Sequence, residues 1–381
     1  MSKFVIKAVP LALVAAFAAS AAHAQDAMVV RIGHVAPLTG GQAHLGKDNE
    51  LGAVMAIEDL NKKGIKIGGK PVKFELVKED DGADAKQGTA VAQKLADEKV
   101  NGVIGHLNSG TSIPASRIYE EAGIPQISPS ATAIKYTDQG YKVTFRVVAN
   151  DGQLGARLAD YAVKTMKDKK VVVIDDRTAY GQGLADVFAK AVKDAGATVS
   201  RQYTSDKVTD FNAQLTSAKG SAPDLVFYGG MDAQAGPMLK QMKQLGLKAK
   251  FMGGDGICST GLIELAGDSM ADGQVICAEA GGVPGTLKKG MDDFRADFKK
   301  RTGQEVQIYA PYVYDAVMTM ADAMQQAGSA DPKVYLPKLA AIKHQGVTGM
   351  ISFDKKGDIK DGSLTLYTYK AGARSEIAVI K

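Results

Sequence analysis

The chain has 381 residues, of which 23% are charged and 45% are hydrophobic, and its formal net charge is +5 at pH 7. This length is too great for one small core, so we expect two lobes. Acidic and basic residues are interspersed along the chain, which excludes a polybasic stripe of the kind that binds nucleic acid or lipid.

The first 24 residues have the pattern of an export signal. Lys3 and Lys7 precede a short apolar run from Ala8 to Ala19, and Ala22-His23-Ala24 is a small-x-small cleavage site. We expect export with cleavage after Ala24, and a charge that falls by two, to +3, when both lysines are removed. The alternative is an N-terminal membrane anchor, but the apolar run is shorter than the roughly 20 residues that span a bilayer.

Strands and helices alternate in the part of the chain that follows. The apolar runs predict strands at 29–36, 72–77, 102–105 and 125–128. Amphipathic stretches between them predict helices at 47–63, 84–98 and 113–121. This alternation is typical of a parallel sheet with helices on both faces.

After Phe145-Arg146 the same alternation starts again. We expect strands at 171–175, 198–203, 225–228, 251–252 and 275–278, with helices at 152–166, 181–195, 210–219, 233–245, 288–301, 309–327 and 332–342. Residues 365–369 and 377–380 read as a closing antiparallel pair. The predicted fold is therefore α/β, with two doubly wound lobes whose short connections allow closure around a ligand.

Two hydroxyl-rich turns follow strands in the first half. Ser109, Thr111 and Ser112 come after one strand, and Ser130 and Thr132 come after the next. Such turns lie where open α/β sheets bind ligands, and hydroxyls with the N–H groups of a helix start form an anion site. Neither turn contains Lys or Arg, so we expect neutral donors that hold a small anion such as a carboxylate reversibly.

Two residues of the second half are candidates for the other side of that site. Asp255 follows a predicted strand in a Gly-Gly-Asp-Gly turn, where it either caps the next helix or faces a ligand ammonium. Tyr180 stands at the mouth of the second half, as a surface aromatic or as a lid that stacks on a ligand.

Motifs for catalysis and cofactors are missing. The chain lacks GxxxxGK[ST] and GxSxG, and its Gly181-Gln182-Gly183 cluster lacks the third small residue of a dinucleotide fingerprint. The histidines lack metal-ligand spacing. His106, beside the first hydroxyl turn, is more consistent with a buried residue paired to backbone than with a general base. We expect no catalytic residue, no metal and no cofactor.

Cys258 and Cys277 both lie in the exported part of the chain. An oxidising compartment favours a disulfide between them, and two unpaired buried thiols are the alternative.

Seven segments of the chain form a recognisable series: EDDGADAKQGTAVAQKL (79–95), VIGHLNSGTSIPASRIYEEAGI (103–124), SPSAT (128–132), DDRTAYGQGLA (175–185), DLVFYGG (224–230), KAKFMGGDG (248–256) and ISFDKKGD (351–358). In this order and spacing they resemble the exported binding proteins of branched-chain amino-acid ABC transporters. The resemblance covers nearly the whole exported chain.

The resemblance implies a type I periplasmic binding protein fold with three crossings between lobes. Mapped here, the first lobe is 27–148 plus 279–354, and the second is 149–278 plus 355–381. It also implies that Ser109, Ser130 (through its backbone amide) and Thr132 hold the ligand carboxylate, that Asp255 and Ser109 hold the ammonium, and that Tyr180 is the lid.

Some positions depart from the leucine-binding members of the family. Leu45 and Met231 stand where those members carry pocket tyrosines, and Gln307 falls near a pocket phenylalanine. Asn108 occupies one cysteine position of a disulfide that those members have in the first lobe. We include these four residues among the candidate ligand-binding residues.

The resemblance implies a monomeric periplasmic receptor that delivers leucine, isoleucine, valine or a related neutral amino acid to a membrane permease, without binding nucleic acid. The alternatives are capture of another small solute (an amide, urea, γ-aminobutyrate or an aromatic acid) and, outside this class, a secreted amide hydrolase.

Overall fold

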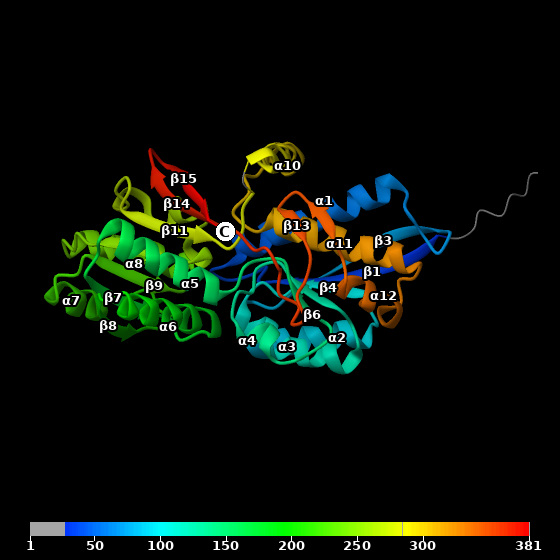
Figure 1. Ribbon diagram of the computed structural model, residues 1–381, viewed down its shortest axis with the longest axis horizontal. Helices are drawn as coiled ribbons and strands as arrows, with labels where there is room; N and C mark the ends of the chain where they lie inside the picture. Colours follow the sequence, from blue (N-terminus) through cyan, green and yellow to red (C-terminus); the bar gives the residue numbers. More distant parts are fainter. Residues whose placement is uncertain (1–26, 284, 381) are drawn as a thin grey trace, which may run out of the picture.

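The computed structural model describes residues 27–380 except residue 284. The predicted export signal lies outside the described residues. Two α/β lobes lie side by side along the long axis of the molecule (Figure 1). Within the described residues, every helix is too short or too polar to cross a membrane.

The first lobe is built on a six-stranded sheet with the order β2-β3-β1-β4-β5-β6. Its strands are parallel except for β2, which pairs antiparallel with β3. Central strands such as β4 are buried along their whole length, as expected for a parallel sheet covered on both faces. The strands are β1 (Met28–Ala36), β2 (Lys66–Ile67), β3 (Lys70–Asp80), β4 (Gly102–Gly105), β5 (Gln126–Ser128) and β6 (Thr144–Arg146).

Helices from two separate parts of the chain, one before and one after the second lobe, cover this sheet. The four earlier ones are α1 (Ala43–Lys63), α2 (Ala85–Asp97), α3 (Ser109–Ala122) and α4 (Lys135–Asp138). The chain later adds α10 (Lys288–Thr302), α11 (Ala310–Ala327), α12 (Pro332–Ala340) and the hairpin β12 (His344–Gly346) and β13 (Gly349–Ile351). Figure 1 shows α11 beside α1. Gly52 permits this close packing, because a Cβ there would lie 2.4 Å from the carbonyl oxygen of Ala310.

The second lobe has a seven-stranded sheet with the order β15-β14-β11-β10-β9-β7-β8. Five strands are parallel, and β14 and β15 form the predicted antiparallel pair. The strands are β7 (Lys170–Asp175), β8 (Thr198–Tyr203), β9 (Leu225–Gly229), β10 (Lys250–Gly253), β11 (Val275–Glu279), β14 (Leu364–Lys370) and β15 (Ala373–Ile380). The helices are α5 (Asp151–Asp160), α6 (Ala179–Asp194), α7 (Asn212–Gly220), α8 (Asp232–Gln244) and α9 (Leu262–Ala266).

The structure differs from the sequence prediction in a few local features. α3 begins at Ser109, one turn earlier than expected, because the Asn108 carbonyl already accepts from the N–H groups of Thr111 and Ser112. The predicted helix at 152–166 continues past α5 as a π-helix from Tyr161 to Met166. The two short hairpin segments, β2 and β12–β13, were not predicted, because strands of two or three residues carry no readable periodicity.

Three connections join the lobes, between β6 and α5, between β11 and α10, and between β13 and β14. They are hydrogen bonded to one another. The N–H of Ala149 donates to the carbonyl of Ala280 at 2.9 Å, and the N–H of Arg146 donates to the carbonyl of Gly357 at the same distance. The connections therefore form one hinge region beside the cleft between the lobes.

Candidate ligand-binding site

A small cavity of about 10 Å³ lies where the two lobes meet. Its lining combines residues from the carboxyl ends of strands in both sheets with one residue just before α11. They are Leu107, Asn108, Ser109, Ser130, Tyr180, Met231, Asp255 and Tyr309. This volume is about that of one water molecule, so the lobes are closed on each other here and must move apart to admit a larger solute.

The first lobe presents the start of α3 and the turn after β5 to this cavity. Ser109 is the first residue of α3 and lines the cavity, so the N-terminal end of that helix, with its free N–H groups, lies at the cavity. The two turns are bonded together. The N–H of Ala133 donates to the Ser109 hydroxyl at 3.2 Å, and the Ser130 hydroxyl donates to the carbonyl of Leu107 at 2.9 Å.

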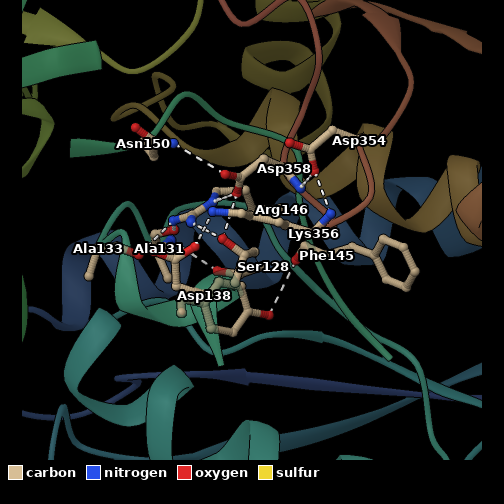
Figure 2. A network of polar contacts seen from close by, with 12 residues as sticks. Ser128, Ala131, Ala133, Asp138, Phe145, Arg146, Asn150, Asp354, Lys356 and Asp358 are labelled. Carbon is tan, nitrogen blue, oxygen red and sulfur yellow. Dashed lines mark hydrogen bonds and ion pairs between the residues drawn. The ribbon is translucent and has the colours of Figure 1, made fainter. Parts of the chain in front are cut away.

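A buried arginine fixes the turn after β5 to the hinge (Figure 2). Nη1 of Arg146 donates to the carbonyls of Ala131 and Ala133, at 2.9 Å in both cases. These two residues flank Thr132 in the chain. Nε of Arg146 donates to Oδ1 of Asp358 at 2.5 Å, and Asn150 Nδ2 donates to Oδ2 of the same carboxylate at 3.2 Å. The turn is thus held in one conformation by the first and third connections.

Asp255 forms the acidic wall contributed by the second lobe. Its carboxylate is 2% exposed and accepts from the Tyr180 hydroxyl at 2.8 Å and from the Tyr309 hydroxyl at 2.9 Å. The short helix that it begins has no side-chain cap, which does not favour the capping interpretation. Burial raises the pKa of Asp255 to about 6, although both hydroxyls oppose this shift.

A second buried acid, Asp151, was not anticipated from the sequence. It is the first residue of α5, is 1% exposed, and neither of its carboxylate oxygens has a hydrogen-bond partner within the described residues. Burial raises its pKa to about 8, and the charge of Asp255 adds to this shift. An isolated aspartate after an asparagine cap gives no sequence signal, because the same pattern occurs at many helix starts.

The candidate ligand-binding residues occupy different positions relative to the cavity. Ser109, Ser130, Tyr180, Asp255, Asn108 and Met231 line it. Thr132 does not, but it is buried and its hydroxyl has no hydrogen-bond partner in the described part of the chain. Leu45 instead packs in the core, and the Gln307 side chain accepts from Thr260 and Gly261.

Two tyrosines shape the acidic side of the cavity. Tyr180 is buried rather than a surface aromatic, and its hydroxyl also accepts from the N–H of Gly256 at 2.9 Å. Tyr309 was not among the predicted site residues. A tyrosine before a helix has no distinctive pattern, and only the return of the chain to the first lobe brings it to Asp255.

His106 is fully buried, as expected, but its partners are side chains rather than backbone. Its ring nitrogens contact Asp81 at 2.9 Å and the Tyr119 hydroxyl at 3.1 Å. Among the described residues, no group of three His, Cys, Asp or Glu side chains is placed to hold a metal ion.

The predicted disulfide between Cys258 and Cys277 is confirmed, with an S–S distance of 2.03 Å. It joins the segment that follows Asp255 to strand β11. The N–H of Cys258 also donates to the carbonyl of Asp255 at 2.9 Å. The disulfide therefore anchors the loop that carries the buried acid.

A larger hollow of about 410 Å³ lies along the three connections. Its charged lining residues, Lys360 and Asp361, are exposed to solvent. Charges that remain hydrated do not select a ligand as strongly as a buried acid does. The smaller cavity between the lobes is thus the better candidate site.

The site can recognise a small molecule with charges of both signs. N–H groups and hydroxyls on one side favour an anion, and the buried Asp255 on the other side favours a cation. Because Ser109 and Asp255 are both buried, these interactions are stronger there than at an exposed surface.

Comparisons with known proteins agree with this architecture. The family model described as periplasmic binding protein matches residues 29–374. The chain is 38% identical to the Leu/Ile/Val-binding protein homolog 1 of Brucella abortus, over 98% of both chains. It is 35% identical to the leucine-, isoleucine-, valine-, threonine- and alanine-binding protein of Pseudomonas aeruginosa, over 95% of this chain and 96% of that protein.

Among solved structures, the fold is similar to the branched-chain amino acid transporter substrate-binding protein LivJ of Streptococcus pneumoniae in complex with isoleucine. The TM-score is 0.83 at 25% identity, and the match covers 92% of this chain and 99% of that one. The two-lobed α/β fold expected from the sequence is thereby confirmed. With a family model that spans most of its length and relatives above 30% identity over nearly their whole length, the chain belongs to the periplasmic binding protein family.

Proposed function

We propose that this protein is the periplasmic solute-binding component of an ABC importer and captures a free neutral amino acid, leucine, isoleucine, valine or a close relative. The observation that carries the proposal is the position of Asp255, buried between two tyrosine hydroxyls across a small cavity from the start of α3. The names of the relatives and the isoleucine bound to LivJ support the same ligand class.

In this proposal each lobe supplies half of the site. The carboxylate of the amino acid binds Ser109, the backbone amide of Ser130, and Thr132, and its ammonium binds Asp255. A ligand that contacts both lobes favours the closed state by its difference in affinity for the closed and open forms. The closed form then docks on the permease and releases its ligand there.

The proposal includes the organisation of the chain. The first lobe comprises 27–148 and 279–354, and the second comprises 149–278 and 355–381. The export signal is cleaved after Ala24, and the mature receptor acts as a monomer. The proposed role requires only reversible binding and assigns no chemical step to the bound ligand, so we infer that the protein is not an enzyme.

Isothermal calorimetry with a designed ligand panel tests this function. L-Leucine, L-isoleucine, L-valine, L-threonine and L-alanine carry both charges, whereas leucinol lacks the carboxylate and 4-methylpentanoate lacks the ammonium. We expect micromolar or tighter binding of at least one amino acid and at least a hundredfold weaker binding of both analogues, because each leaves one half of the site unpaired.

The same panel separates the alternatives. Tight binding of benzoate, γ-aminobutyrate, urea or a simple amide, with no response to the amino acids, would replace the proposed ligand. Release of ammonia from a bound amide, followed by mass spectrometry, would instead indicate a hydrolase.

A further inference from the structure

A second set of contacts joins the lobes outside the ligand cavity. His44, near the start of α1, contacts Asp232, the first residue of α8, with 2.7 Å between Nε2 and Oδ2. The Asp232 side chain is fully buried, and that of His44 is 29% exposed. The Ser259 hydroxyl donates to the same carboxylate oxygen. None of these three residues lines the ligand cavity.

A neutral contact lies beside it. Oε1 of Gln307 accepts from the Thr260 hydroxyl and from the N–H of Gly261, at 2.8 Å in both cases. A Cβ at Gly261 would lie 3.0 Å from Cδ2 of His44 and 3.2 Å from Oε1 of Gln307, so the two contacts adjoin each other. We call the set His44, Asp232, Ser259, Thr260, Gly261 and Gln307 the clasp.

The surroundings of His44 are acidic. Burial lowers its pKa, but the hydrogen bond and charge of Asp232 and the charges of Asp48 and Glu264 raise it, and the net pKa is raised above the usual 6.5. Asp48 is held on the same helix by four N–H groups at 307–310. Glu264 belongs to α9 of the second lobe. Acids of both lobes therefore favour a protonated imidazole.

We propose that the clasp is a pH-sensitive latch that holds the two lobes closed while His44 is protonated and weakens when His44 loses its proton. This inference rests on the proposed function, because closure around the ligand is what the latch would stabilise. When the lobes separate, His44 loses Asp232 and returns toward its ordinary pKa. His44 therefore binds its proton more tightly in the closed form than in the open form. The stabilisation of the closed form by the latch is fully present below pH 6.5 and is lost as pH rises through the raised pKa of His44.

Two other groups change the affinity with pH in the opposite direction. Asp255 lines the cavity, and Asp151 interacts electrostatically with it. Both have raised pKa values, so protonation at low pH weakens the attraction of this acidic pair for an ammonium. A single pH profile would mix these effects with that of His44. The ratio between a variant and the wild-type protein removes them, because both proteins keep the two acids.

The test compares His44→Gln with wild type by calorimetry with L-leucine from pH 5.5 to 8. Glutamine retains a donor for Asp232 but carries no charge. We expect the variant to bind roughly three- to tenfold more weakly at pH 5.5 and nearly equally at pH 8. Gln307→Ala removes only the neutral contact, so its loss of affinity should not depend on pH.

His344→Gln is the matched control. Nδ1 of His344 lies 2.9 Å from Oδ2 of Asp322, which repeats the imidazole–carboxylate contact within the first lobe, without a partner in the second. This variant should follow the wild-type profile. A His44→Gln to wild-type ratio that is constant with pH, or equal to that of the control, would overturn the proposal.

Small-angle X-ray scattering of the ligand-free protein supplies a readout that needs no ligand. At pH 5.5 the His44→Gln variant should have a larger radius of gyration than wild type, and at pH 8 the two should agree. If no amino acid binds, the proposed function fails, and the scattering comparison still decides whether the latch exists. Equal radii at both pH values would contradict the latch.

Discussion

Replacing Asp255 by asparagine should make the ligand-free protein more stable and its ligand binding weaker. The carboxylate is 2% exposed, and its pKa is raised from 3.8 to about 6, mainly by burial. At 1.36 kcal/mol per pKa unit, keeping this group ionised in the empty cavity costs about 3 kcal/mol above pH 6. Asparagine has nearly the same shape and removes that cost.

The direction with pH follows from the same shift. Below pH 3.8 the carboxyl group is protonated in both the folded and unfolded chains, so Asp255→Asn and wild type should have equal stability. As pH rises from 4 through 6, the wild-type protein alone loses stability, and the advantage of the variant approaches about 3 kcal/mol at pH 7.5. Urea denaturation of the ligand-free proteins at several pH values measures this difference.

Ligand binding should change in the opposite direction. Removing one member of a buried charge pair costs about 2–5 kcal/mol, so the amino acid should bind on the order of a hundredfold more weakly to Asp255→Asn. Asp268→Asn is the matched control, because its side chain is 93% exposed and should leave both quantities unchanged. A ligand-free variant that is less stable than wild type, together with unchanged affinity, would refute the reasoning.

Two further predictions concern the supports of the site. Replacing Cys258 and Cys277 by alanine opens a loop of 19 residues and should lower the free energy of unfolding by about 3 kcal/mol. Labelling of two thiols in unfolded, unreduced wild-type protein would contradict the disulfide. Arg146→Met should lower the free energy of unfolding, measured by urea denaturation, by about 3–5 kcal/mol, because it leaves Asp358 without its buried partner. Arg117 is exposed, so Arg117→Met should lower the free energy of unfolding by less than about 1 kcal/mol. An Arg146 variant as stable as the Arg117 variant would show that the network in Figure 2 does not hold the turn.

Local patterns in the sequence were sufficient to predict most of the strands and helices. The strand β4 was predicted with its exact bounds, and the antiparallel pair β14–β15 was anticipated, although β15 begins at Ala373 rather than at 377. These features were readable because parallel strands need continuous apolar runs and helices need a 3.6-residue period. The turns that carry Ser109 and Asp255 were readable for a related reason, since each directly follows a predicted strand end.

Only the tertiary structure decided which residues from distant segments meet. Tyr309 reaches Asp255 because the chain returns to the first lobe after β11, and Gln307 contacts Thr260 and Gly261 rather than the cavity for the same reason. The pairing of His44 with Asp232 joins residues 188 positions apart. Such contacts depend on side-chain packing across a closed interface, which has no period along the sequence, so no local pattern encodes them.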